Sequence, residues 1–597
     1  MSVVNEPVAP DVRDQATPDE VGASGARHPW ATAVAVGVVL GAFALPLRGL
    51  LRYQGPPMEE GFMLAFPQEV LRGQIPNRDF LHLYGPGSLW VLAGIFKAFG
   101  TSLATERFAG LAQHVGVVFG IFFLSRQWGR VVAVVAALVS LFIILPPVGL
   151  TAMAWNGAVA FGLWALVVGL GAVRGDGVRA WGGGTDALRR LTADTDEATR
   201  RRADRRLLAA GLLAGVALLY RPDLVVAVTL GLGALVWHQD RRARVRLLTG
   251  LGIGVSPYLV QFALAGPGHA IQGMVLDPVF RLRGGRSLPV PPPWGHLNGF
   301  LQKAAGLRTI GWPVPHLAAA HEAFLWFFLV PLSAIFVAVT GWWCHRRAQG
   351  SYRAQVLFTT GMFSLGMLTQ SLQRPDTAHF AWVSCVSVAL VPVACAELAG
   401  HLAHRRGGPV PAGAALGVAA LLLVGVMPLF TVRTYVDLSE QSFGRNVFGY
   451  PINNEGRNFY YGNAEDAAAA NQVVQALDRI QVPGKRLLVG PTDLRKTPYS
   501  DAFFYFLFPK LAVGTYYIEM DPGMANRPTS GLAHEVATSD YLILSDVWSN
   551  WVEPNTSRTF GPNAPNEEVA KHFCLVGAYG AGEAHPKGVF QLYRRCR

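Results

Sequence analysis

The chain has 597 residues, of which 51% are hydrophobic and only 15% are charged. Soluble domains contain about 25% charged residues, and the apolar residues here gather in long runs. These proportions exclude a disordered chain and a small disulfide scaffold, and they disfavour an ordinary soluble enzyme. They predict a polytopic α-helical membrane protein. The formal net charge of +12 fits either a nucleic-acid-binding protein or arginine-rich cytoplasmic loops, so its position in the chain must decide.

The apolar runs predict eleven membrane spans, because a helix needs about 20 apolar residues to cross a bilayer. They lie at 30–51, 105–125, 131–148, 151–173, 207–220, 224–238, 247–265, 322–343, 354–372, 380–400 and 410–430. The two short runs on either side of Arg221-Pro222-Asp223 predict a hairpin of short helices. Two further stretches in the first outer loop (52–104), at 59–72 and 86–100, suit helices that lie along the membrane surface.

The arginine-rich loops set the predicted orientation. Their arginines are Arg174, Arg179, Arg189, Arg190, Arg200, Arg201, Arg202, Arg205, Arg206, Arg241, Arg242, Arg244, Arg246, Arg346, Arg347, Arg353, Arg405 and Arg406. With eleven spans these loops all fall on one side, which the positive-inside rule assigns to the cytoplasm. The basic balance is then a topology signal and argues against nucleic acid. The preference for arginine, with the Ala and Gly content, indicates a bacterium, and the predicted location is the cytoplasmic membrane.

Three parts of the chain are expected. Residues 1–29 form a cytoplasmic tail, 30–430 the transmembrane domain, and 431–597 an extracytoplasmic α/β domain with a helix at 464–479 and short strand candidates after it. Cys574 and Cys596 are the only cysteines of the last part and flank its terminal strands. A disulfide between them is expected outside the cell, and two free thiols are the alternative.

Two adjacent carboxylates, Glu59 and Glu60, follow the first span at the outer surface. A carboxylate there could act as general base on an acceptor hydroxyl or help to bind a metal. A pair of solvated loop charges is the alternative.

Arginines beside aspartates also face outward in this topology. Arg-Pro-Asp occurs at Arg221–Asp223 and at Arg374–Asp376, and His379 follows the second turn. The planar, permanently charged guanidinium suits phosphate oxygens, whereas local neutralisation of Arg by Asp is the alternative. Further candidates to bind a lipid phosphate or a sugar are Arg78, Asp79 and His82. Trp155 could stack on a sugar, but membrane-interface tryptophans are common.

The first outer loop carries several motifs in a fixed order. These are Met58-Glu59-Glu60-Gly61-Phe62, Leu71 to Phe80, Tyr84-Gly85-Pro86-Gly87, Phe96 to Gly100, and Glu106-Arg107. The order resembles the GT-C glycosyltransferase superfamily, and within it the protein O-mannosyltransferase and aminoarabinose-transferase-like branch. That pattern has Asp-Glu after the first span, an Arg-Asp-Phe turn, a surface helix that ends in Phe-Gly, and an Arg in the next span. This chain departs from it at Glu59, where Asp is usual, at Asn77 and at Gly85-Pro86-Gly87.

The resemblance implies an inverting transferase that takes a sugar from a polyprenyl phosphate at the outer membrane face, in the assembly of cell-envelope glycans, glycolipids or glycoproteins. Glu59 or Glu60 would deprotonate the acceptor, which is a glycan, a lipid or a protein. Arg221, Arg374 and Arg78 would stabilise the phosphate. No cofactor and no metal are expected, because this branch generally uses none. A lipid-linked sugar flippase or transporter, or a non-catalytic scaffold with an exterior binding domain, remain the alternatives.

Overall fold

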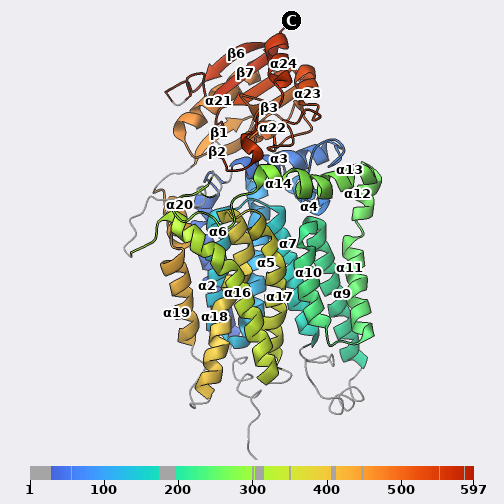
Figure 1. Ribbon diagram of the computed structural model, residues 1–597, viewed down its shortest axis with the longest axis vertical. Helices are drawn as coiled ribbons and strands as arrows, with labels where there is room; N and C mark the ends of the chain where they lie inside the picture. Colours follow the sequence, from blue (N-terminus) through green and yellow to red (C-terminus); the bar gives the residue numbers. More distant parts are fainter. Residues whose placement is uncertain are drawn as a thin grey trace, which may run out of the picture.

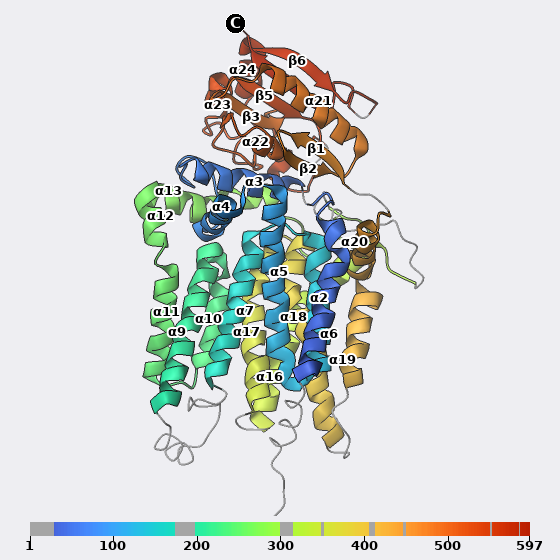
Figure 2. The ribbon, with the colours of Figure 1, turned by 180° about the vertical axis from the view of Figure 1, so that it is seen from behind.

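The computed structural model describes residues 29–55, 57–173, 197–298, 302, 315–347, 351–404, 412–445, 449–549, 552–583 and 585–596. Long helices run side by side in a bundle, and a C-terminal sheet with its own helices lies above one end of that bundle (Figure 1). Seen from behind, a layer of short helices separates the two parts (Figure 2). The candidate functional site lies between the bundle and this layer.

Helices occur at each of the eleven predicted spans. They are α2 (Pro29–Leu50), α5 (Leu103–Ser125), α6 (Arg130–Val148), α7 (Ala154–Val173), α9 (Glu197–Tyr220), α10 (Val225–Val236), α11 (Arg241–Val255) with α12 (Tyr258–Ala265), α16 (Ala319–Arg347), α17 (Tyr352–Gln373), α18 (Thr377–His404) and α19 (Ala412–Ala420). Among the described residues, seven helices are long and apolar enough to cross a membrane, or eight if a bent pair counts as one span. The chain is therefore a multi-pass membrane protein, and the number eleven stays a prediction.

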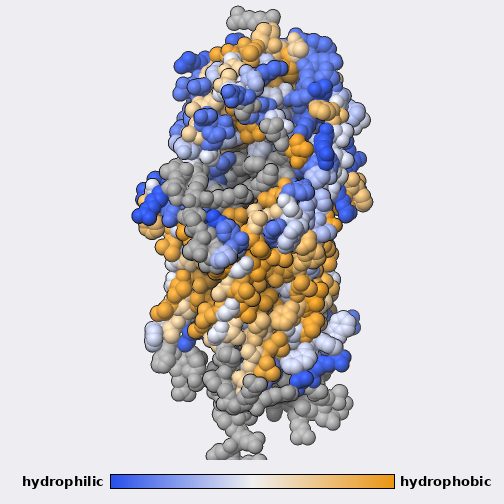
Figure 3. Space-filling view, turned by 60° about the vertical axis from the view of Figure 1, so that its left-hand side comes forward, coloured by the Kyte–Doolittle hydropathy of each residue, from blue (hydrophilic) through white to orange (hydrophobic). Residues whose placement is uncertain are grey.

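On the face seen in Figure 3, hydrophobic side chains cover the middle of the bundle, and hydrophilic side chains gather above it. Large apolar residues point outward within the belt, among them Leu332, which is 61% exposed, and Leu259, which is 70% exposed. Such a surface is stable against lipid tails and not against water.

The bundle continues past residue 430, where the sequence analysis ended the transmembrane domain. Pro428 has no amide hydrogen to donate, and at this point the chain bends by 86°. Glu322 of α16 accepts a hydrogen bond from the amide of Leu429 (3.0 Å), which satisfies one of the donors freed by the bend. The next helix, α20 (Thr434–Ser442), then packs against α2.

The layer above the bundle is built from α3 (Pro57–Leu71), α4 (Pro86–Phe99), α13 (Pro267–Ile271), η4 (Gln272–Arg281) and α14 (Arg283–Arg286). Both surface helices predicted in the first outer loop are present as α3 and α4, which pack against each other. On its other side α3 contacts α22 (Phe503–Leu507) of the C-terminal part. The first outer loop thus links the bundle to the sheet.

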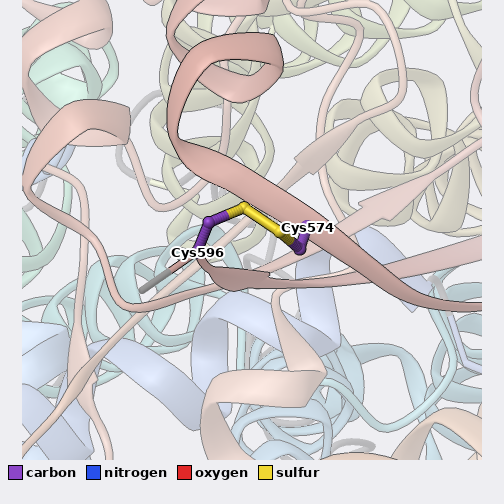
Figure 4. The surroundings of a disulfide bond; sticks show 2 residues. All are labelled: Cys574 and Cys596. Carbon is purple, nitrogen blue, oxygen red and sulfur yellow. A yellow bond between two sulfur atoms is a disulfide. The ribbon is translucent and has the colours of Figure 1, made fainter.

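The C-terminal part is an α/β unit. A hairpin of β1 (Tyr450–Asn454) and β2 (Arg457–Tyr461) precedes α21 (Ala464–Ile480), which Asn463 caps. The main sheet has the order β4-β3-β5-β7-β6, from β3 (Arg486–Pro491), β4 (Ala512–Val513), β5 (Tyr541–Ser545), β6 (Phe573–Tyr579) and β7 (Phe590–Arg595). β3 runs parallel to β4 and β5, whereas β7 runs antiparallel to β5 and β6. A disulfide joins Cys574 to Cys596 beside the β6–β7 pair (Figure 4).

Candidate functional site

Glu59 and Glu60 occupy the first turn of α3 but have different surroundings. Glu60 is fully buried in a two-pronged ion pair with Arg107, whose Nε and Nη2 lie 2.6 and 2.7 Å from its carboxylate oxygens. Arg107 also donates hydrogen bonds to the carbonyls of Leu50 and Tyr53. Glu60 therefore ties α3, α5 and the end of α2 together.

Glu59 instead lines a cavity of about 380 Å³ between the bundle and the layer above it. It forms no ion pair with any described residue. Burial raises the pKa of Glu59 to about 7, and the nearby guanidinium groups of Arg286 and Arg374 pull it partly back. A pKa near neutrality is suited to a general base.

Arg221 lines the same cavity from the turn between α9 and α10. Its guanidinium is bound to Asp223 by two hydrogen bonds, of 2.9 Å from Nε and 2.5 Å from Nη2. It also lies over the rings of Tyr84 and Trp155, 4.4 and 5.1 Å from their centroids. These contacts fix the plane of the guanidinium, and Gln370 steadies Asp223 through a further hydrogen bond.

Arg374, between α17 and α18, is 3% exposed and bound on several sides. Its Nε donates to Asp376 (2.8 Å), and its two terminal nitrogens donate to Glu553 of the C-terminal part (3.0 and 2.6 Å). Asp376 also accepts hydrogen bonds from the backbone and the ring of His379 (2.9 and 2.8 Å). Burial would raise the pKa of Asp376, but His379 and Arg374 outweigh that effect and hold it well below its usual range.

A third arginine, Arg286 at the end of α14, also lines the cavity. Its guanidinium lies 5.7 Å from the centroid of the Tyr499 ring and 3.9 Å from Oδ1 of Asp521. It donates no hydrogen bond to the described residues, in contrast to Arg221 and Arg374. Its N–H groups, like those of the exposed Arg283 that also lines the cavity, are therefore available to a ligand there.

The rest of the cavity wall is mixed, with polar residues such as Arg283, Ser287 and Gln373 beside many apolar ones. Its apolar lining residues include Met153, Val225, Met274, Val275, Pro278, Val279, Leu282 and Trp382. Val275 and Val279 of η4 are 45% and 47% exposed, so this wall continues onto the outer surface of the molecule. A cavity lined by four arginines (Arg221, Arg283, Arg286 and Arg374), with an apolar exit, suits an amphiphile with an anionic head.

The remaining predicted residues lie outside the cavity lining. Arg78 and Asp79 form an exposed ion pair (2.9 Å), and Asp79 also accepts from the amide of Ile75. His82 is buried between the rings of Phe66 and Tyr84. Burial lowers the pKa of His82 to about 3, so its ring is neutral.

The described residues place one group of possible metal ligands together, far from Glu59. Cys344, Glu397 and His401 have ligand atoms within 4.8 Å of one another. Glu397 already accepts a hydrogen bond from Trp128 (2.6 Å) and lies 3.8 Å from a guanidinium nitrogen of Arg353. A positive neighbour at that distance works against binding of a cation.

No protein-family model and no curated protein matches the sequence. Among solved structures, ArnT from Cupriavidus metallidurans bound to undecaprenyl phosphate is similar over 95% of this chain and 98% of its own length, with 14% identity and a TM-score of 0.52. The oligosaccharyltransferase AglB from Archaeoglobus fulgidus is similar over 96% of this chain and 75% of its own, with 11% identity and a TM-score of 0.46. The chain has the GT-C glycosyltransferase fold. The fold predicted from the motifs of residues 50–130 is thereby confirmed.

Within this GT-C fold, two residues that the sequence analysis missed complete the site. Arg286 belongs to Arg281-Leu282-Arg283-Gly284-Gly285-Arg286, a basic run in a loop assigned to the outer side, where few arginines are expected. The unexpected arginines of this outer loop could therefore have marked it as a candidate binding segment. Glu553 reaches Arg374 from 179 positions along the chain, and no local pattern marks it.

Proposed function

We propose that the protein is an inverting glycosyltransferase that uses a polyprenyl-phosphate-linked sugar. The observation that carries the proposal is the shared cavity, in which Glu59 faces Arg221, Arg286 and Arg374 beside an apolar exit. The GT-C fold and the undecaprenyl phosphate bound by the similar ArnT support a lipid phosphate as the donor's head group.

In the proposed reaction Glu59 takes the proton of an acceptor hydroxyl. The freed oxygen forms a bond with the anomeric carbon from the face opposite the phosphate, and the bond between that carbon and the phosphate oxygen breaks. The electron pair leaves with the lipid phosphate, and the configuration of the anomeric carbon inverts. The pKa of Glu59, about 7, matches this role at physiological pH.

Arg221, Arg286 and Arg374 would stabilise the negative charge of the departing phosphate. Arg221 and Arg374 are held rigidly by Asp223, Asp376 and Glu553, so little reorganisation is needed when charge develops. Arg286 supplies the donors that the protein does not use. The lipid tail would leave along η4, whose Val275, Val279 and Phe280 are exposed.

The side of the membrane follows from the charges. Arginines of the described loop ends, including Arg241, Arg242, Arg346 and Arg347, lie at the opposite end of the bundle from the cavity. The positive-inside rule then assigns the cavity and the C-terminal part to the outer face of the cytoplasmic membrane. The Cys574–Cys596 disulfide supports an oxidising exterior for that part.

The test is a transfer assay with purified protein, cell-envelope acceptors and a panel of undecaprenyl-phosphate hexoses and pentoses. The wild type should release undecaprenyl phosphate from at least one donor, and Glu59→Gln should not. A protein that binds undecaprenyl phosphate and moves donors across vesicles without releasing the sugar would be a flippase. A protein that neither binds nor cleaves any donor would contradict the proposal.

A further inference from the structure

A second large hollow lies on the lipid-facing side of the bundle, at the end opposite the proposed active site. It has a volume of about 830 Å³ and is lined by residues of α10, α16 and α17 and of the turn after α10. α17 packs against both α10 and α16 and forms the floor of this groove. Because α10 ends at Val236, after only 12 residues, the groove opens beyond its last turn.

One end of the groove carries the positive charge of Arg346, the only Lys or Arg among the described residues that line it. His238, His345 and Arg346 all line the groove at this end. His238 and Arg346 are close enough to His345 to interact with it electrostatically. Arg244 stands close by, because its guanidinium donates to the carbonyls of Val236 and Trp237 at the end of α10 (3.3 and 2.8 Å). No carboxylate is among the residues that line the groove.

The deeper part of the groove is apolar, with Leu230, Phe358 and Met362 along its length. Two tryptophans stand near its basic end. Trp237 is 70% exposed, and Trp342 lies flat against the guanidinium of Arg346, 4.3 Å from ring centroid to Cζ. Exposed tryptophans at the ends of membrane helices mark the level of the lipid head groups.

We infer that this groove binds an anionic phospholipid of the leaflet on the arginine-rich side. The phosphate lies at Arg346 and His238, and an acyl chain lies along α17. A basic pocket between helices beside an apolar channel is the arrangement that recognises anionic head groups. The inference does not depend on the proposed transferase activity, because no residue of the Glu59 cavity takes part.

The chain offers a matched control for the head-group contact. Arg347 neighbours Arg346 and also stacks on a tryptophan, Trp343, at 4.1 Å, but it does not line the groove. Gly233 offers a test of the apolar part, because a Cβ added there meets no heavy atom within 4 Å. Gly233→Leu should therefore fill the groove without disturbing the packing of the helices.

The experiment is native mass spectrometry of the full-length protein, delipidated in detergent and offered equal amounts of dioleoyl phosphatidylglycerol and dioleoyl phosphatidylcholine. The wild type should retain phosphatidylglycerol about fivefold more than phosphatidylcholine, the ratio expected for one basic contact. Arg346→Ala should abolish the preference, Arg347→Ala should keep it, and Gly233→Leu should reduce retention of both lipids.

Equal retention of the two lipids by the wild type would overturn the inference. So would an equal loss of preference in Arg347→Ala, because the charge of the helix end would then suffice without the groove. Melting temperatures of the three variants, measured beside the wild type, show that each is folded. If Arg346→Ala does not fold, unchanged retention by a folded Gly233→Leu would still overturn the inference.

Discussion

At the scale of single residues, the two glutamates at the start of α3 show how neighbours in sequence acquire different roles. Glu60 is neutralised by Arg107 in a buried pair, whereas Glu59 faces a cavity and forms no ion pair with a described residue. The paired carboxylate of Glu60 holds α3 to α5 through Arg107. An unpaired, partly desolvated carboxylate is poised to take a proton.

Glu59→Gln should remove a general base without removing a structural contact. We expect the transfer rate to fall about 10² to 10⁴-fold, the range that such a base contributes. The melting temperature of the detergent-solubilised protein should not fall. A variant that keeps the full transfer rate would rule out Glu59 as the base.

Glu60→Gln should behave in the opposite way. It leaves the charge of Arg107 buried and unpaired, which costs about 3–5 kcal/mol of stability. Thermal unfolding followed by fluorescence should show a clearly lower melting temperature for this variant than for Glu59→Gln. If the two variants melt alike, the Glu60–Arg107 pair does not have the structural role assigned to it.

The transfer rate should also depend on pH through Glu59. Burial raises the pKa of its carboxyl group to about 7, and only the ionised form accepts a proton. Activity should therefore be low below pH 7 and rise to a plateau above it. A profile of kcat/KM over about pH 6 to pH 8 checks this, and a plateau already reached at the acid end would contradict it.

At the scale of elements, one loop of the C-terminal part, around Glu553 and Asn555, is hydrogen-bonded to two of the three segments that carry the arginines of the cavity. Glu553 accepts from Arg374, and Asn555 donates to Glu553 (3.0 Å) and to the carbonyl of Ser287 (2.9 Å), next to Arg286. The C-terminal part therefore helps to position Arg374 and the segment of Arg286, although none of its described residues lines the cavity.

Glu553→Ala should loosen Arg374 and weaken the affinity for undecaprenyl phosphate about tenfold or more, because a buried charge loses its partner. The exposed pair of Asp493 and Arg495, whose side chains are 38% and 42% exposed, is a control within the same part of the chain. Asp493→Ala should leave binding unchanged. Equal binding by Glu553→Ala and the wild type, measured by microscale thermophoresis, would show that Arg374 needs no support from Glu553.

The elements that could be predicted from sequence are those with a strong local pattern. The apolar runs predicted the helices of the bundle, and the two short stretches at 59–72 and 86–100 predicted α3 and α4. The bend at Pro428 and the β1–β2 hairpin were not predicted. Both depend on contacts between residues that lie apart in the sequence, such as the hydrogen bond from the amide of Leu429 to Glu322. The two Arg-Pro-Asp turns carry a local sequence pattern and could be predicted. Glu553 contacts Arg374 from a distant part of the chain, so no local pattern predicts it.

At the scale of the whole molecule, the arginine-rich helix ends and the Glu59 cavity lie at opposite ends of one bundle. The arginine-rich helix ends, of which Arg346 lines the second groove, belong to the proposed cytoplasmic side. The carboxylate, the three arginines and the C-terminal sheet belong to the proposed outer side. The position of the excess positive charge is the basis of the proposed orientation in the membrane.

This orientation predicts the outcome of cysteine labelling. In a background without Cys344, Cys385 and Cys395, Arg479→Cys on α21 should react with a membrane-impermeant maleimide in cells whose outer barrier is opened. Arg200→Cys at the start of α9 should react only after lysis. The reverse pattern would place the cavity in the cytoplasm and contradict the proposed side of action.

The central claim is that the Glu59 cavity receives a lipid phosphate. The most direct measurement is a cryo-EM structure of the full-length protein with undecaprenyl phosphate. We predict that the phosphate lies within hydrogen-bond distance of Arg286, close to Glu59, with the lipid chain leaving along η4. A phosphate bound elsewhere, with this cavity empty at saturating lipid, would contradict the account.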